Sequence, residues 1–277
     1  MANSLTNLIP TIYAAANVIL RELTGFIPAV TLFASPEQVA KDQTVRYPIV
    51  PSYSAGDVAA AATGPDPADT TVDSDTMTIS KERSVTFYWT GNDQLGLGGM
   101  YDVILRDQFA QSMRTLINEV EADLAGLYVA ASRAYGTAGT TPFDSTTKLA
   151  ALAQLLKILE DNGAPTSDLQ FVMNTTAAAA MRTLTELSSV GDAGNDDLLR
   201  RGVLNNIFGF DIRRSAQVKN HTKGTGSGYL VDLTAGYAVG TKTFHVDTGA
   251  NTIVAGDILT NNKTSRDSNK YVVKTGF

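Results

Sequence analysis

Cysteine is absent from the sequence, and histidine occurs only twice, at His221 and His245. A chain without cysteine has no disulfide, no thiolate nucleophile and no thiolate ligand for zinc. Metal sites need clustered ligands, whereas the two histidines sit apart in the sequence. We therefore expect neither a metal site nor a cofactor.

Other signatures of chemistry are also missing. Gly96-Leu97-Gly98-Gly99 precedes a helical pattern, but it lacks the third glycine, the later acidic residue and the lysine of phosphate-binding loops. No Gly-x-Ser-x-Gly nucleophile elbow occurs. A run of aspartates lacks the glycine and the final glutamate of a calcium loop: Asp66, Asp69, Asp73 and Asp75. These absences predict a protein that is not an enzyme.

Long apolar runs and an excess of basic charge are lacking too. No stretch of about 18 apolar residues exists, so no transmembrane helix is predicted. Residues 1–7 carry no positive side chain, and Pro10 and Asn17 interrupt the apolar stretch that follows, which argues against a secretory signal. The net charge of −6 argues against a reader of nucleic-acid sequence.

The order of the segments that are present is the most informative feature. Thr11–Leu23 has an apolar face and stops at Gly25 and Pro28, which predicts an N-terminal core helix or an arm that packs on a neighbour. Thr44–Ile49 and Met77–Thr90 have strand patterns, and the polar stretch between them, rich in Gly, Pro and Ala, cannot form a core. We interpret this region as a long β-hairpin with an extended tip; a disordered surface loop is the alternative.

A long amphipathic helix is predicted from about Gly99 to Ala134, because apolar side chains recur in steps of three, four and seven. The apolar positions are Val103, Ile104, Met113, Leu116, Ile117, Val120, Leu124, Leu127, Tyr128 and Ala131. The opposite, polar face carries Arg106, Asp107, Arg114, Glu119, Glu121 and Asp123. A coiled coil is the less favoured interpretation, since the heptad is not sustained.

A smaller α/β section and an all-β section follow. A leucine stripe predicts a helix that Ser145 or Thr146 caps and Gly163 ends. Strands at Leu169–Met173 and Phe210–Ser215 are expected to flank a helix from Thr175 or Thr176 to Leu187. The β-rich section has predicted strands at Tyr229–Leu233, Thr243–Val246, Ile253–Leu259 and Lys270–Lys274.

Local motifs resemble those of the major capsid proteins of tailed bacteriophages. The stretch Asp168-Leu-Gln-Phe-Val-Met-Asn174 before an alanine-rich helix is similar to a motif of that family, as is Gly202 through Phe208-Gly-Phe-Asp-Ile212 to Ser215. Phe244-His-Val-Asp247 with Ala255-Gly-Asp-Ile258 resembles the β domain that is inserted in one branch. The order of elements matches over most of residues 1–260.

The resemblance implies an α+β capsid fold with five parts. These are an N-terminal arm (1–43), an extended β-hairpin loop (44–90), a spine helix with a peripheral domain (91–144), an axial α/β domain with a returning strand (145–222), and a β-rich inserted domain (223–277). The last part is expected to be incomplete, because the family's closing strands do not occur before Phe277.

The resemblance also implies a function. Copies of such proteins form hexamers and pentamers of an icosahedral virus head that encloses double-stranded DNA. The implied partners are other copies, a separate scaffolding protein, a portal protein and the packaged DNA, contacted non-specifically. The implied location is the virion, after assembly in the host cytoplasm and without a membrane.

Charged and aromatic residues of the loop and the axial domain are candidates for contacts between subunits, although solvated surface charge is an alternative reading. They are Tyr53, Asp57, Lys81, Glu82, Arg83, Arg200, Arg201, Arg213 and Arg214. Two other functions stay open. One is an encapsulin-type compartment shell, which shares the fold and packages cargo enzymes, and the other is a monomeric module that binds a ligand on its β-rich region.

Overall fold

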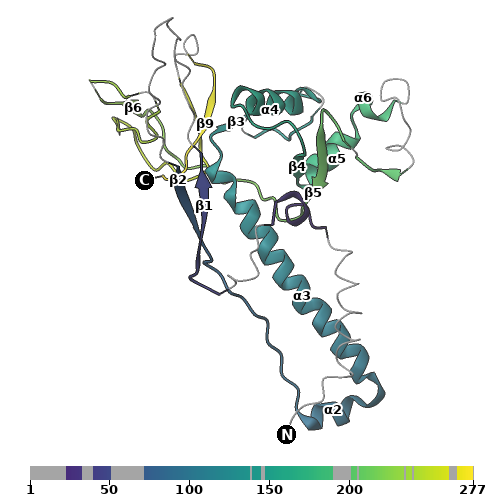
Figure 1. Ribbon diagram of the computed structural model, residues 1–277. Helices are drawn as coiled ribbons and strands as arrows, with labels where there is room; N and C mark the ends of the chain where they lie inside the picture. The colour runs from purple at the N-terminus through teal and green to yellow at the C-terminus, as the bar shows by residue number, and fades with distance from the viewer. Residues whose placement is uncertain are drawn as a thin grey trace, which may run out of the picture. The chain divides into compact units, whose positions relative to one another are not determined.

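The computed structural model describes residues 23–32, 40–50, 72–137, 139–144, 147–189, 201–204, 206–233, 235–238, 240–261 and 267–276. The fold mixes helices and sheets (Figure 1). The chain divides into two compact units. The smaller unit is Thr31–Phe87, and the larger one combines Met1–Val30 with Tyr88–Phe277.

The smaller unit contains an antiparallel hairpin. Strand β1 (Thr44–Ile49) has the predicted bounds and pairs with β2 (Asp73–Thr78), so that Thr44 lies opposite Thr78. The predicted strand Met77–Thr90 is wrong beyond Thr78. The segment before β1 turns away at Asp42, whose φ is 66°. Residues 80–87 therefore have no neighbouring strand of the hairpin to pair with. The tip of the hairpin, residues 51–71, lies outside the described residues.

The long helix begins later than predicted and has a helical turn in front of it. Helix α2 (Gly91–Leu97) starts with a reciprocal cap, in which the Thr90 hydroxyl accepts from Asp93 N and the Asp93 carboxylate accepts from Thr90 N. The 3-10 turn η2 (Gly98–Met100) then leads into α3 (Tyr101–Gly126). Gly98 has a φ of 50°, which marks the break between α2 and the next turn.

Helix α3 has 26 residues and is therefore about 39 Å long. It continues as the 3-10 turn η3 (Leu127–Ala130), so the predicted helical span ends near Ala130 rather than Ala134. Only Leu105 and Glu121 are buried in α3. Burial of Glu121 contradicts its assignment to the polar face, and its consequences are described below.

The core of the larger unit lies around a pair of parallel strands, β4 (Leu169–Met173) and β5 (Phe210–Arg214). Helices α4 (Ala150–Asp161) and α5 (Thr175–Arg182) lie beside this pair in Figure 1. The buried cluster consists of Phe143, Leu152, Met173, Ala177, Ala178, Met181, Leu184 and Phe210. The ring of Phe171 meets the rings of Phe143 and Phe210 edge-on, with centroids 5.9 and 6.1 Å apart.

The ends of the helices in this core lie close to the positions that the sequence predicts. Gly163 has a φ of 69° and follows the end of α4, as predicted. Helix α5 begins at Thr175, as predicted, and Asn174 caps it, because the Asn174 side-chain oxygen accepts from Ala177 N at 2.8 Å. The helix predicted to reach Leu187 is divided into α5 and the short α6 (Thr185–Ser188). The predicted caps Ser145 and Thr146 lie outside the described residues.

The N-terminal segment packs against the β4–β5 pair on the side of Val172. The 3-10 turn η1 (Ile27–Ala29) packs on both β4 and α3. Gly25 passes close to the Arg214 carbonyl and the Val172 side chain. Parallel strands need apolar or backbone cover on both faces, which explains why this short segment is fixed here.

The β-rich region has shorter strands than predicted. Strand β6 (Leu230–Val231) pairs with β7 (Val246–Asp247), and β8 (Ile258–Thr260) pairs with β9 (Lys270–Val272). Strand β9 also pairs with β3 (Arg133–Ala134), which follows the long helix, so the sheet order is β3-β9-β8. Turns at Thr248 and Asn251, both with positive φ, interrupt the extended chain.

Candidate interaction surface and its anchors

Exposed large apolar side chains outnumber buried apolar ones in the described part of the chain. One group, which we term the α2 surface, lies around the start of the long helix: Tyr88, Leu95, Met100 and Val103. Tyr88 is 85% exposed and Leu95 is 82% exposed. The β-rich region exposes Leu230, Val231, Leu233, Phe244, Val254, Ile258 and Leu259, and the hairpin unit exposes Ile49, Val50, Val72, Met77, Val85 and Phe87. Contiguous apolar surface often lies at contacts with other proteins, so these side chains are candidates for such contacts.

A groove of about 460 Å³ adjoins the α2 surface. It is lined by Tyr88, Trp89, Asn92, Asp93, Gly96, Leu97 and Gln108. Trp89, the only tryptophan, donates from Nε1 to Gln108 Oε1 at 2.6 Å and meets the ring of Tyr101 edge-on. The single acid here, Asp93, has its pKa lowered by the Thr90 hydroxyl and the Thr90 N–H. Asp93 caps α2, so its carboxylate is engaged within the chain.

A buried carboxylate joins the long helix to two distant segments. Glu121 is 1% exposed. Its oxygens accept from Gly25 N (3.2 Å), Phe26 N (3.0 Å), Ile27 N (2.8 Å) and Ser215 Oγ (2.8 Å). We term this arrangement the Glu121 anchor. It fixes the N-terminal segment and the end of β5 to the same turn of α3.

The electrostatics of the anchor favour the ionised form of Glu121. Burial, the largest single influence, would raise its pKa, but the hydrogen bonds from Ile27, Phe26, Ser215 and Gly25 together outweigh it. The pKa of Glu121 is therefore lowered from its ordinary value. A buried carboxylate with four donors is satisfied, because each backbone N–H replaces a water molecule that burial removed.

Gly25 allows the N-terminal segment to reach this anchor. A Cβ at this position would lie 2.6 Å from the Arg214 carbonyl oxygen and 2.8 Å from Val172 Cγ1. We expect Gly25→Ala to lower the free energy of unfolding by about 1–3 kcal/mol, because a backbone oxygen cannot move aside as a flexible side chain can. Urea denaturation of the unassembled subunit measures this change.

Gly126 provides the matched control for that substitution. It lies in helical conformation at the end of α3, with a φ of −66°, and a Cβ there meets nothing within 4 Å. Gly126→Ala should raise the stability by about 0.5–1 kcal/mol, since alanine loses less backbone entropy on folding. Equal effects of the two alanines would contradict the close packing of Gly25.

A second polar junction lies two helical turns further along. Tyr128 of η3 contacts His221 Nδ1 through its hydroxyl at 2.7 Å, and His221 Nε2 contacts Asp257 Oδ1 at 2.8 Å. The Asp257 carboxylate also accepts from Gly224 N and Val254 N. The junction ties the end of the long helix to two loops of the β-rich region.

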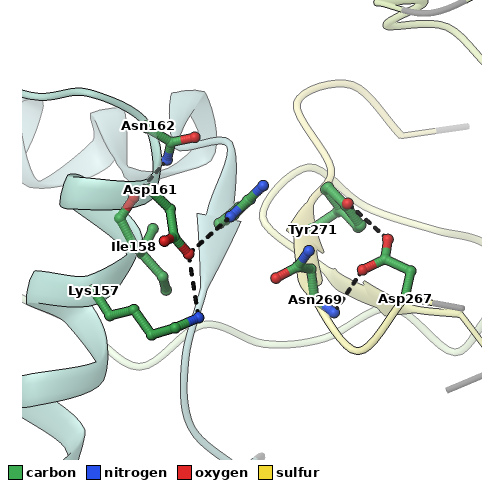
Figure 2. A network of polar contacts seen from close by, with 8 residues as sticks. Lys157, Ile158, Asp161, Asn162, Asp267, Asn269 and Tyr271 are labelled. Atoms are coloured by element: carbon green, nitrogen blue, oxygen red, sulfur yellow. Dashed lines mark hydrogen bonds and ion pairs between the residues drawn. The ribbon is translucent and has the colours of Figure 1, made fainter. Parts of the chain in front are cut away.

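A third network connects α4 with the three-stranded sheet (Figure 2). Asp161 of α4 contacts Lys157 at 3.2 Å and Arg133 of β3 at 3.9 Å. Across the sheet, Asp267 accepts from Asn269 N and from the Tyr271 hydroxyl, which together lower the pKa of Asp267. Lys157 and Asp161 are well exposed, so we expect each ion pair to contribute less than about 1 kcal/mol.

The structure locates some of the predicted contact residues and leaves others outside its description. Tyr53, Asp57 and Arg200 are outside the described residues. Lys81, Glu82, Arg83 and Arg201 are exposed. Arg213 donates from Nε to Gln170 Oε1 at 2.6 Å within the face of the β4–β5 pair, and Arg214 is exposed at the end of β5. Lys81, Glu82 and Arg83 belong to the smaller unit, and Arg201, Arg213 and Arg214 belong to the larger one.

Sequence reasoning missed the Glu121 anchor, although a signal for it exists. Ile117, Glu121, Leu124 and Tyr128 follow one another in steps of four, three and four. This spacing places Glu121 on the apolar stripe rather than on the polar face. An acid within such a stripe indicates a buried carboxylate with a specific partner.

Two other kinds of site are absent from the described residues. No group of three or more His, Cys, Asp or Glu side chains there is placed to hold a metal ion. No helix among these residues is long and apolar enough to cross a membrane.

Comparison with known proteins identifies the fold. No protein-family model matches the sequence, and no curated protein matches it either. The structure is similar to a chain in the capsid structure of the cyanophage P-SCSP1u, with a TM-score of 0.55 and 14% identity over 91% of this chain and 82% of that chain. The chain has a phage capsid fold.

A chain from Mycobacterium phage Che8 gives a second match, with a TM-score of 0.54 and 20% identity over 70% of this chain and 75% of that chain. At these identities the likeness concerns the fold. The predicted resemblance to phage capsid proteins is thereby confirmed at that level, as is the mixed α+β class.

Proposed function

We propose that this chain is the major capsid protein of a tailed bacteriophage. Its copies assemble as hexamers and pentamers into an icosahedral head that encloses double-stranded DNA. The observation that carries the proposal is the likeness to a cyanophage capsid chain across 91% of the residues. The exposed apolar side chains of the α2 surface, the hairpin unit and the β-rich region support it independently, because they need partners.

Each part of the chain has a role in this proposal. Residues 1–43 form the arm, 44–90 the loop over a neighbouring subunit, 91–144 the spine and peripheral domain, 145–222 the axial domain and 223–277 the inserted β-rich domain. Exposed charges at Lys81, Glu82, Arg83, Arg201 and Arg214 set the register between subunits. The role is structural rather than enzymatic.

The physical mechanism is the burial of apolar surface between copies. Obligate interfaces commonly bury more than about 2,000 Å², which is worth tens of kcal/mol before the cost of association is subtracted. Quasi-equivalent contacts of this type close into a shell. A separate scaffolding protein guides closure in the host cytoplasm, a portal protein occupies one vertex, and the DNA is contacted non-specifically.

Expression of the chain alone and with a co-expressed scaffolding protein tests the proposal. We expect closed shells tens of nanometres across in negative-stain microscopy, and elution in the void volume of a size-exclusion column. A subunit that stays monomeric at micromolar concentration under both conditions would overturn the proposal and favour the ligand-binding module. Shells that take up cargo enzymes instead of DNA would identify an encapsulin-type compartment.

The α2 surface gives a sharper prediction. Leu95→Gln should raise the critical concentration for assembly about tenfold to a hundredfold, because each subunit loses about 1.5–3 kcal/mol of leucine burial. The fold should be unaffected, since Leu95 is 82% exposed in the free subunit. Light scattering against subunit concentration measures the effect.

Leu95→Met is the matched control and should assemble like the original chain, because methionine preserves apolar volume. If Leu95→Gln assembles like the original chain, the α2 surface is not part of the interface between subunits.

A further inference from the structure

Three side chains of the second polar junction form a hydrogen-bonded series. The Tyr128 hydroxyl lies 2.7 Å from His221 Nδ1, and His221 Nε2 lies 2.8 Å from Asp257 Oδ1. A weak nucleophile, an imidazole within hydrogen-bond reach and a carboxylate that orients the imidazole are the parts of an activated nucleophile.

The direction of the hydrogen bonds follows from the charge of Asp257. Burial would raise the pKa of this carboxyl, but hydrogen bonds from His221, Val254 and Gly224 outweigh it, so that the pKa is lowered. An ionised carboxylate only accepts, and therefore His221 Nε2 carries the proton in the neutral imidazole. Nδ1 is left with its lone pair, and the Tyr128 hydroxyl donates to it.

The surrounding backbone holds the series in place. A Cβ on Gly256 would lie 2.7 Å from the Tyr128 ring and 3.0 Å from His221 Cε1, and the φ of 93° at Gly256 also favours glycine. The rings of Tyr128 and His221 meet edge-on with centroids 5.7 Å apart. Tyr128 is nevertheless 48% exposed, so part of its side chain faces solvent.

We propose that Tyr128 is a nucleophilic modification site that takes acyl groups from activated acyl donors. His221 acts as the general base, and Asp257 is a positioning residue that holds the imidazole in the required tautomer. The site has the geometry of a nucleophile and base, without a preformed pocket for a particular acyl chain, so the substrate class is a small activated acyl group.

The reaction with N-acetylimidazole shows which bonds form and break in the acyl transfer and where the proton goes. The Tyr128 oxygen attacks the acetyl carbon, an O–C bond forms and the C–N bond to the reagent's imidazole breaks. The phenol proton passes to His221 Nδ1. The departing imidazole takes up a proton, which restores neutral His221 and leaves an O-acetyl ester on Tyr128.

The unmodified full-length protein provides its own controls. Tyr135 is 44% exposed and Tyr271 is 41% exposed, both close to the value for Tyr128. No imidazole contact with either ring is found in the described part of the chain. The Tyr271 hydroxyl donates to Asp267, and this bond raises the pKa of Tyr271. Exposure alone therefore predicts similar reactivity for the three tyrosines, whereas activation predicts that Tyr128 reacts first.

Limited treatment with N-acetylimidazole, followed by peptide mass spectrometry over time, tests the proposal. We expect Tyr128 to be acetylated at least about a hundredfold faster than Tyr135, the lower end of the range of general-base catalysis, with Tyr271 slowest. Hydroxylamine should remove the label, which distinguishes a tyrosine ester from acetylated Lys219 or Lys223. Equal or slower labelling of Tyr128 relative to Tyr135 would overturn the proposal without any variant.

His221→Gln separates the base from a purely structural role. Glutamine keeps hydrogen-bonding capacity but not basicity, so the ratio of Tyr128 to Tyr135 labelling should fall to about one while the urea midpoint changes little. Asp257→Asn should lower the ratio partially, because the tautomer is no longer fixed. An unchanged ratio in His221→Gln would show that the histidine only packs against the tyrosine.

Discussion

Replacing Glu121 by alanine should detach residues 25–27 from α3 and lower the free energy of unfolding by about 3–5 kcal/mol. Three backbone N–H groups and the Ser215 hydroxyl lose a charged acceptor in this variant. Each buried donor left without a partner costs about 1–3 kcal/mol, and release of the segment limits the total. Urea denaturation gives the energy, and limited proteolysis near residues 23–30 reports detachment.

Two further variants provide comparisons for the loss of unfolding free energy in Glu121→Ala. Glu121→Gln keeps the shape and one acceptor oxygen, so its loss should be smaller than that of alanine. Asp102→Ala removes an exposed acid from the first turn of the same helix and should cost less than about 1 kcal/mol. If Glu121→Ala behaves like Asp102→Ala, the carboxylate does not hold the segment. Shell yield should follow the same order if the proposed function is correct.

The pH dependence of the anchor has a defined sign. The pKa of Glu121 is lower in the folded chain than its ordinary value of 4.5. Its stabilisation is therefore complete above the ordinary value and is lost as the pH falls through the lowered folded value. The stability difference between the original chain and Glu121→Gln should shrink in that acid range, where the other carboxylates titrate in both proteins alike.

Phe210→Ala should destabilise the subunit by about 3–5 kcal/mol, the usual cost of removing a buried phenylalanine. Phe210 is 3% exposed, begins β5 and meets the ring of Phe171 edge-on. The cavity would lie between β5 and the α5 side of the core, where Met181 and Ala178 have no exposed surface. The free energy of unfolding from urea titration gives the magnitude.

Phe208, two residues earlier, is the matched control. It is 49% exposed and lies in the turn before β5. Phe208→Ala should cost less than about 1 kcal/mol, because it leaves no cavity. Similar losses for both variants would mean that the β4–β5 pair is not the centre of the core.

Sequence patterns correctly predicted the helices and strands that are determined by residues close to one another in the sequence. Strand β1 at Thr44–Ile49 and strand β4 at Leu169–Met173 have their predicted bounds. Leu152 is the buried centre of the predicted leucine stripe in α4. The residues that determine each of these elements, which are β-branched or periodic apolar side chains and, for α4, Gly163, lie within a few positions of one another in the sequence. The phage capsid fold was also recognised from the order of such elements.

Features that depend on distant partners could not be predicted in the same way. Strand β3 is only two residues long and exists because β9 pairs with it. The helix α2 was missed although Thr90 and Asp93 have capping-box spacing, because the glycines around it suggested a break. The strand expected beyond Thr78 failed because its partner turns at Asp42. Which residues contact neighbouring subunits stays a prediction.

The order of strands in the β3-β9-β8 sheet has a consequence for synthesis on the ribosome. The central strand, Lys270–Val272, is the last of the three to be translated, whereas β3 at Arg133–Ala134 lies near the middle of the sequence. Pairing across such a separation is slow to form and comes late. A nascent chain therefore holds β3 and β8 apart until residue 272 has emerged, and a prematurely released fragment lacks the strand that joins the two.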